Sequence, residues 1–200
     1  MSARLFSFAL LLAVVACGPL VQVGGGGKPP GSLFVLRAPP PPPSSPVAPR
    51  VTILVGQPAV VGTLQTLRVP VIEADTRVTY LVRATWAEQP SKQFQRLLID
   101  TLDTRPGLMA LSATQTDGIA DRELSGTLVE FGLDMRVPAQ PKVRLRYDAV
   151  LTGPKRKLLA VHRFETVRPV GSADPNTVAE GLNAAANIMA ADVAAWVMPS

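Results

Sequence analysis

The chain has 200 residues, about the length of one domain, and a formal net charge of +5. Apolar residues make up 47% and charged residues 18%, which is enough apolar material for a core and argues against full disorder. One cysteine and one histidine exclude an intrachain disulfide and a zinc site built from Cys and His ligands. The basic excess permits contact with anionic lipid or nucleic acid and requires neither.

Residues 1–16 are predicted to be a secretory signal. Arg4 precedes an apolar run from Leu5 to Ala16. As a helix this run would span about 18 Å, too short for a hydrocarbon core of about 30 Å. A basic residue, a short apolar stretch and small residues before a cleavage site are typical of secretion signals.

The end of this signal, Val14-Val15-Ala16-Cys17, resembles the bacterial lipobox. The resemblance implies a diacylglycerol thioether on Cys17, cleavage before it, and acylation of the new amine, with palmitate-type chains. Two or more acyl chains hold a protein stably on a membrane. Gly18 follows instead of the Asp that retains many lipoproteins at the inner membrane, which favours the outer membrane, facing the periplasm. The alternative is a chance Cys in a plain signal peptide.

Residues 17–31 are predicted to be a flexible tether, because they contain the glycines 24–27 and Pro29-Pro30-Gly31. The glycines before Lys28 do not predict a phosphate-binding loop, since Pro29 stands where Ser or Thr is needed. Residues 32–200 are predicted to form a single domain. It begins with a short strand, residues 32–37, and a rigid connection through the five prolines 39–43.

The first half of the domain contains further strand signals at residues 51–55, 67–72, 78–84 and 108–114. Pro70 suggests that the second of these is an edge strand or a strand end. Between residues 89 and 103 the period changes to that of a helix. The apolar stripe of this predicted helix consists of Phe94, Leu97, Leu98, Thr101 and Leu102.

The second half predicts three consecutive strands at residues 129–137, 143–151 and 158–167, joined by short turns as an antiparallel meander. In the last strand Leu159 and Val161 are out of step with Phe164, so we expect a bulge near His162 or two covered faces. A terminal helix follows Asp174, which is a suitable N-cap. The predicted fold class is α+β, a mainly antiparallel sheet with two helices packed on it.

The order of these segments resembles the auxiliary lipoproteins of ABC-type transporters. It is most similar to the lipoprotein partner of MCE-type (mammalian-cell-entry) lipid transport systems, a group that includes the paraquat-inducible lipoprotein. The most specific segment is Tyr80–Leu102, with Trp86 just before the helix. Beyond it the match is one of pattern: the lipobox, the meander and a terminal helix ending in Ala195-Trp196-Val197. The long proline run and Phe34, where tyrosines are expected, depart from the family.

The resemblance implies a non-enzymatic lipoprotein of the outer membrane that serves a periplasmic lipid bridge. Its partners would be an MCE protein, a permease and an ATPase, with phospholipid or another hydrophobic molecule as cargo and no cofactor. An adaptor around a tunnel would favour a homo-oligomer whose symmetry matches its partner. The first alternative is an outer-membrane assembly lipoprotein that supports a β-barrel, as in lipopolysaccharide export; the second is a periplasmic hydrolase.

Several residues are candidates for function and have plainer interpretations. Trp86 and Trp196 stand at helix boundaries, where large aromatics are more often core residues. His162 has no nucleophile motif beside it, which favours a solvated or structural histidine.

Two basic groups could contact anionic lipid heads or an acidic partner: Lys142, Arg144 and Arg146, and Lys155, Arg156 and Lys157. No spacing singles out a catalytic pair among the carboxylates Asp100, Asp103, Asp117, Asp121 and Glu123. Nucleic acid is not expected, since no stacking aromatics are interleaved with the basic residues.

Overall fold

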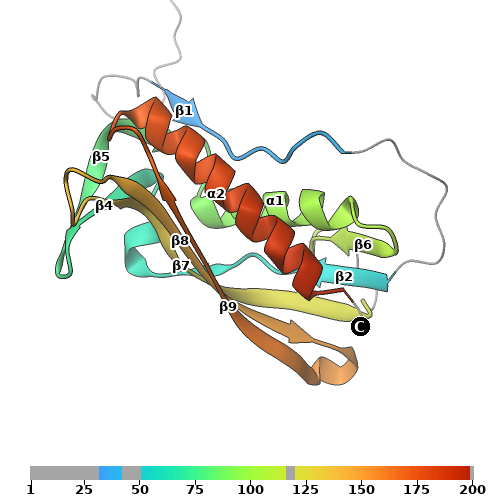
Figure 1. Cartoon of the computed structure of the whole chain (residues 1–200). Helices are drawn as coiled ribbons and strands as arrows, with labels where there is room; N and C mark the ends of the chain where they lie inside the picture. The colour runs from blue at the N-terminus through green and yellow to red at the C-terminus, as the bar shows by residue number, and fades with distance from the viewer. Residues whose placement is uncertain (1–31, 42–50, 116–119, 199–200) are drawn as a thin grey trace, which may run out of the picture.

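The computed structural model describes residues 32–41, 51–115 and 120–198. The predicted signal, Cys17, the predicted tether, the last two prolines of the run and Asp117 lie outside these ranges. Within them, nine strands form one sheet, and two α-helices pack side by side on one of its faces (Figure 1).

The sheet is built around β7 (Arg122–Asp134), which pairs along both of its edges. On one edge β8 (Lys142–Thr152) runs antiparallel to β7, and β9 (Leu158–Pro169) runs antiparallel to β8, which confirms the predicted meander. On the other edge β7 pairs in parallel with β2 (Val51–Val55), β3 (Ala59–Val60) and β4, one after another. The long strand β7 therefore joins the two halves of the chain.

The remaining pairings make the sheet mixed. β4 (Arg68–Ala74) is antiparallel to β5 (Arg77–Trp86), β1 (Leu33–Phe34) is parallel to β5, and β6 (Leu108–Leu111) is parallel to β2. The expectation of a mainly antiparallel sheet is therefore wrong. Alternation of apolar residues predicts that a segment is a strand, but the direction of its neighbour depends on how the chain returns to the sheet. Three segments from the first half all reach β7 running in the same direction as β7.

Two local predictions about the strands are also corrected. β4 lies between β5 and β7, so Pro70 does not mark an edge. The β4–β5 ladder shifts register between Arg68 and Pro70, and this interruption accommodates a residue without an N–H. The bulge of β9 falls at Leu159, whereas His162 is in regular register opposite Ala149.

The two helices agree with their predicted positions. α1 (Pro90–Asp103) buries Phe94, Leu97, Leu98 and Leu102. α2 (Pro175–Trp196) begins at its predicted cap, where the Asp174 carboxylate accepts hydrogen bonds from the backbone N–H groups of the second and third helical residues. Single 3-10 turns, η1 (Gly62–Leu64) and η2 (Pro154–Arg156), precede β4 and β9.

The core lies between the helices and the sheet. β8 alternates as predicted, burying its odd-numbered residues from Val143 to Leu151. Ring contacts link the layers: the Phe94 and Tyr147 centroids are 5.3 Å apart, as are those of Trp86 and Phe131. β7 buries residues on both faces near its end, and a Cβ on Gly132 would stand 2.5 Å from the Pro70 carbonyl oxygen.

Candidate interaction surfaces

The chain from Ser32 to Pro41, which we call the strap, lies along α1 and α2 (Figure 1). Only Leu33 and Phe34 belong to a strand, so the predicted strand over residues 32–37 is mostly wrong. The Leu36 N–H donates to Gln93 Oε1 at 2.7 Å, and Gln93 Nε2 donates to the Phe34 carbonyl at 3.4 Å. The buried side-chain amide of Gln93 thus accepts a hydrogen bond from one backbone N–H of the strap and donates one to a backbone carbonyl.

α2 holds the next residue of the strap in the same manner. The Arg37 N–H donates to Asn183 Oδ1 at 2.8 Å, and Asn187 Nδ2 donates to the Arg37 carbonyl at 2.9 Å. Side-chain amides therefore replace the backbone hydrogen bonds that a neighbouring strand would supply. This role was not predicted, although a polar amide at position 93, on the apolar side of the predicted helix, is a signal for it.

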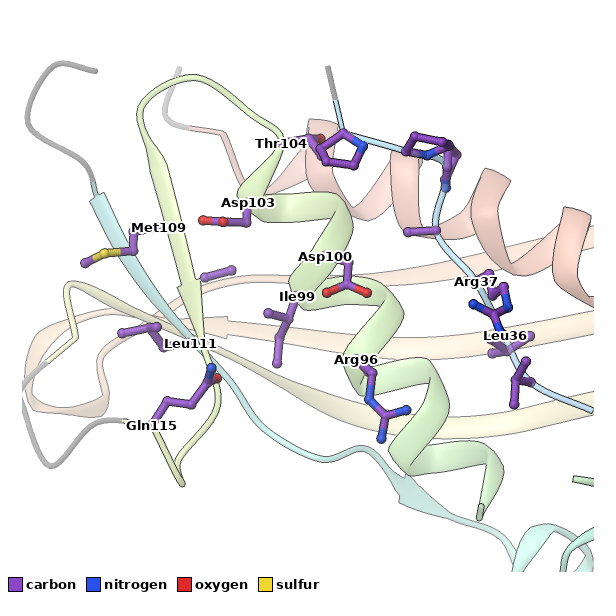
Figure 2. Close-up of a pocket in the computed structure, with 16 residues that line it drawn as sticks. Leu36, Arg37, Arg96, Ile99, Asp100, Asp103, Thr104, Met109, Leu111 and Gln115 are labelled. Atoms are coloured by element: carbon purple, nitrogen blue, oxygen red, sulfur yellow. The ribbon is translucent and has the colours of Figure 1, made fainter. Parts of the chain in front are cut away.

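A cavity of about 1120 Å³ lies between the strap, α1 and β6 (Figure 2). Its lining mixes charged groups with apolar ones. Burial raises the pKa of Asp100 above its usual value, Arg96 opposes that rise, and Asp103 adds to it. The charged lining residues are Arg37, Arg96, Asp100 and Asp103.

The four candidate carboxylates within the described ranges do not converge on one site. Asp100 and Asp103 line the cavity, whereas Asp121 accepts a hydrogen bond from the Thr52 N–H at 2.8 Å, and Glu123 sits on β7 opposite Thr152. Across the described ranges, no group of three or more His, Cys, Asp or Glu side chains could hold a metal ion.

On the sheet face opposite the helices, Lys142, Arg144 and Arg146 lie together, as the alternation predicts. Two of them form ion pairs with one carboxylate: Arg144 Nε is 2.9 Å from Glu130 Oε2, and Arg146 Nη1 is 3.2 Å from Glu130 Oε1. This face is therefore not an open cationic surface.

Arg144 Nη1 is also 4.0 Å from Oδ2 of the buried Asp134, which extends the network. Arg136 Nη2 is 2.8 Å from Asp134 Oδ2, and Arg136 Nη1 is 3.2 Å from Asp75 Oδ1. The hydrogen bonds from Arg136 hold the pKa of Asp134 below its usual value, against the opposing effect of burial. Charges of opposite sign alternate along this network and stabilise it.

The second basic group differs from the first. Lys155, Arg156 and Lys157 lie in the hairpin turn between β8 and β9, followed by Leu158 and Leu159. All five residues are exposed, and within the described part of the chain none of the three cations forms an ion pair. We call residues 155–159 the basic tip.

The β9 edge is a further candidate surface. In the described part of the sheet β9 pairs with β8 alone, so its second backbone edge is open. Val161 and Val167 point away from the helices and are 63% and 47% exposed. A long strand with exposed apolar residues and an open edge is a template for another strand.

Comparison with known proteins identifies the family of the chain. Residues 34–194 match the family described as the ABC-type transport auxiliary lipoprotein component. The chain belongs to this family. Membership makes it a component of an ABC-type transport system and a lipoprotein, a class held at a membrane of the cell envelope.

Solved structures share the fold. A crystal structure of a protein from Xanthomonas campestris aligns with a TM-score of 0.69 and 18% identity, covering 82% of this chain and 92% of that one. A second crystal structure, of an uncharacterized protein, aligns with a TM-score of 0.63 and 18% identity. The alignment covers 84% of this chain and 100% of that one. No curated protein matches the sequence.

Both tryptophans of the chain pack against other aromatic rings. Trp86 is 1% exposed and packs against Phe34 and Phe131, which confirms that it belongs to the core. Trp196 is partly buried near the end of α2, with its ring centroid 6.0 Å from that of His162. His162 also makes an edge contact with Phe164 at 4.5 Å. The histidine is thus part of an aromatic cluster that closes the end of the helical layer.

No helix in the described ranges is long and apolar enough to cross a membrane.

Proposed function

We propose that the chain is a non-enzymatic adaptor of an MCE-type transport system that moves phospholipid or another hydrophobic molecule between membranes. Cys17 carries the lipid that anchors it to the outer membrane, and the domain faces the periplasm. One observation carries the proposal: the lipoprotein-family match begins at residue 34, shortly after the chain's single cysteine, which completes a lipobox-like sequence. The MCE protein, its permease and its ATPase are the proposed partners.

The β9 edge supports a binding role. Strand addition to an open edge gains main-chain hydrogen bonds, and exposed side chains beside the edge supply specificity. Val161 and Val167 are placed to do this. The partner strand belongs to the MCE protein or to a second copy of the chain, and a ring of copies would match a tunnel-forming partner.

The direct test is affinity purification of the tagged protein from its native host in mild detergent, followed by mass spectrometry. The proposal expects an MCE protein, a permease and an ATPase. Recovery of an outer-membrane β-barrel protein without any MCE protein would replace this proposal with the barrel-support function.

A matched pair of variants assigns the docking surface. Val161→Lys with Val167→Lys places two charges beside the open edge and should abolish recovery of the partner. Val78→Lys with Val82→Lys adds the same charge on β5, where both residues are also exposed, and should leave recovery unchanged. Equal recovery from both pairs would rule out β9 as the docking strand.

A further inference from the structure

We infer that the basic tip docks onto an anionic lipid surface. This contact goes beyond the adaptor function, because it gives the folded domain its own attachment to a membrane. It also separates the two basic groups: Arg144 and Arg146 of the first are held in ion pairs within the sheet, whereas no cation of the second forms one in the described structure.

The side chains of the tip have the chemistry of an interfacial lipid contact. Lys155, Arg156 and Lys157 are exposed cations without an ion pair in the described structure, and anionic headgroups attract such side chains. Leu158 and Leu159 follow directly and are 59% and 45% exposed. Apolar side chains next to basic ones enter the boundary between headgroups and acyl chains while the cations stay with the phosphates.

The backbone of the turn has an unusual conformation. Lys155 and Arg156 have φ angles of 58° and 59°, in the left-handed region. Two-residue hairpin turns with this geometry favour Asn and Gly, because the Cβ of most other residues is strained at a positive φ. Here two basic residues occupy those positions despite the strain, and both are exposed at the end of the hairpin.

The position of the tip allows it to reach a membrane. The strap begins beside the first residues of α2, where Leu33 and Asn176 line a shared groove, and the hairpin extends past the other end of α2 (Figure 1). α2 has 22 residues and is about 33 Å long. The chain from Cys17 to Ser32 spans at most about 50 Å. This step rests on the proposed anchor: a lipid on Cys17 keeps a membrane within reach of the tip.

The test uses the mature lipidated protein with Leu158→Cys. If the Cys17 thiol is lipidated, the new cysteine is the reactive one and takes a polarity-sensitive fluorophore. The protein is reconstituted through its anchor into discs of phosphatidylcholine with or without phosphatidylglycerol, and vesicles of both compositions are then added. We expect the emission of the fluorophore to shift to the blue when phosphatidylglycerol is present in the disc or in the vesicles. With phosphatidylcholine alone we expect no shift. A label at Thr76→Cys, in the exposed β4–β5 turn, should not respond.

Two triple variants in the Leu158→Cys background separate the tip from overall charge. The first variant combines Lys155→Gln, Arg156→Gln and Lys157→Gln. It should need about a hundredfold more anionic lipid to reach half of the maximal emission shift. Arg77→Gln, Arg83→Gln and Lys92→Gln remove the same charge from exposed positions elsewhere and should leave the amount of lipid needed within about twofold.

Three results would overturn the inference. One is an unchanged spectrum with both lipid compositions, and another is an equal loss in the two triple variants. The third is a tip variant that keeps the lipid response of the parent but no longer recovers the transport proteins, which would make the tip a protein-docking surface. The mass of the Cys17 peptide reports the anchor separately. A bare thiol with an intact tip response would refute the anchor and keep the tip's lipid contact.

Discussion

Gln93 and Leu36 are joined by a hydrogen bond of 2.7 Å between a side-chain amide on α1 and the backbone of the strap. Gln93 is only 3% exposed, so this polar group is buried with its partners already in place. The bond fixes the strap against the helical layer. It thereby keeps the backbone of Phe34 and Leu36 beside α1.

Replacing Gln93 with Ala should release the strap. The change leaves the Leu36 N–H without its partner, which typically costs about 1–3 kcal/mol of unfolding free energy. Hydrogen exchange at Leu36 should become faster, and urea denaturation should give the loss of stability. Lys92→Ala, at the exposed neighbouring position, should change neither. If the Leu36 amide exchanges as slowly in Gln93→Ala as in the parent, the strap is held by other contacts.

Gly132→Ala tests the close approach of β7 and β4. The added Cβ would stand 2.5 Å from the Pro70 carbonyl oxygen, so the two strands must move apart. We expect a loss of about 1–3 kcal/mol, measured by thermal or urea unfolding. Gly171→Ala is the matched control, because no atom lies within 4 Å of its added Cβ. A Gly132→Ala protein as stable as the control would contradict the described pairing of β4 with β7.

Asp134→Asn tests the charge network through its pH dependence. Because the folded-state pKa of Asp134 lies below its usual value of 3.8, the carboxylate contributes stability above about pH 4 and loses it as the pH falls through the folded value. At pH 7 the variant should be less stable by about 1–3 kcal/mol, and the difference should shrink in acid. Asp148→Asn, in an exposed pair with Arg163, should lose less because water screens that pair. A difference that stays constant from pH 7 to pH 3 would show that Asp134 does not titrate as described.

His162→Ala tests the non-enzymatic interpretation. The ring lies against Phe164 and Trp196, so its removal should cost at most about 1 kcal/mol and leave transport unchanged. Growth or lipid transport in the native host, at equal protein levels, is the measurement. Complete loss of function with normal protein levels would revive the hydrolase alternative.

Local sequence patterns predicted the helices and most strands. The apolar stripe of α1, the Asp174 cap of α2 and the strict alternation of β8 each result from interactions within a few residues of chain. The parallel pairings of β7 were not predictable in the same way. They join segments that are distant in sequence, and no periodicity carries the direction of a neighbour.

The candidate surfaces were predicted unevenly for a related reason. Alternation placed Lys142, Arg144 and Arg146 on one face, but the paired carboxylate, Glu130, comes from another strand and could not be assigned. The basic tip was visible as a run of charges, whereas the exposure of Leu158 and Leu159 beside it is seen only in the structure. The amides that hold the strap act across the two helices and have no local signature.

The mature N-terminus of the protein, isolated from its native host, tests the central claim most directly. Mass spectrometry should find a chain that begins at Cys17, with a diacylglycerol thioether on the sulfur and a fatty acyl group on the amine. A bare Cys17 thiol, or a mature chain cleaved at another position, would contradict the account of a lipid-anchored adaptor.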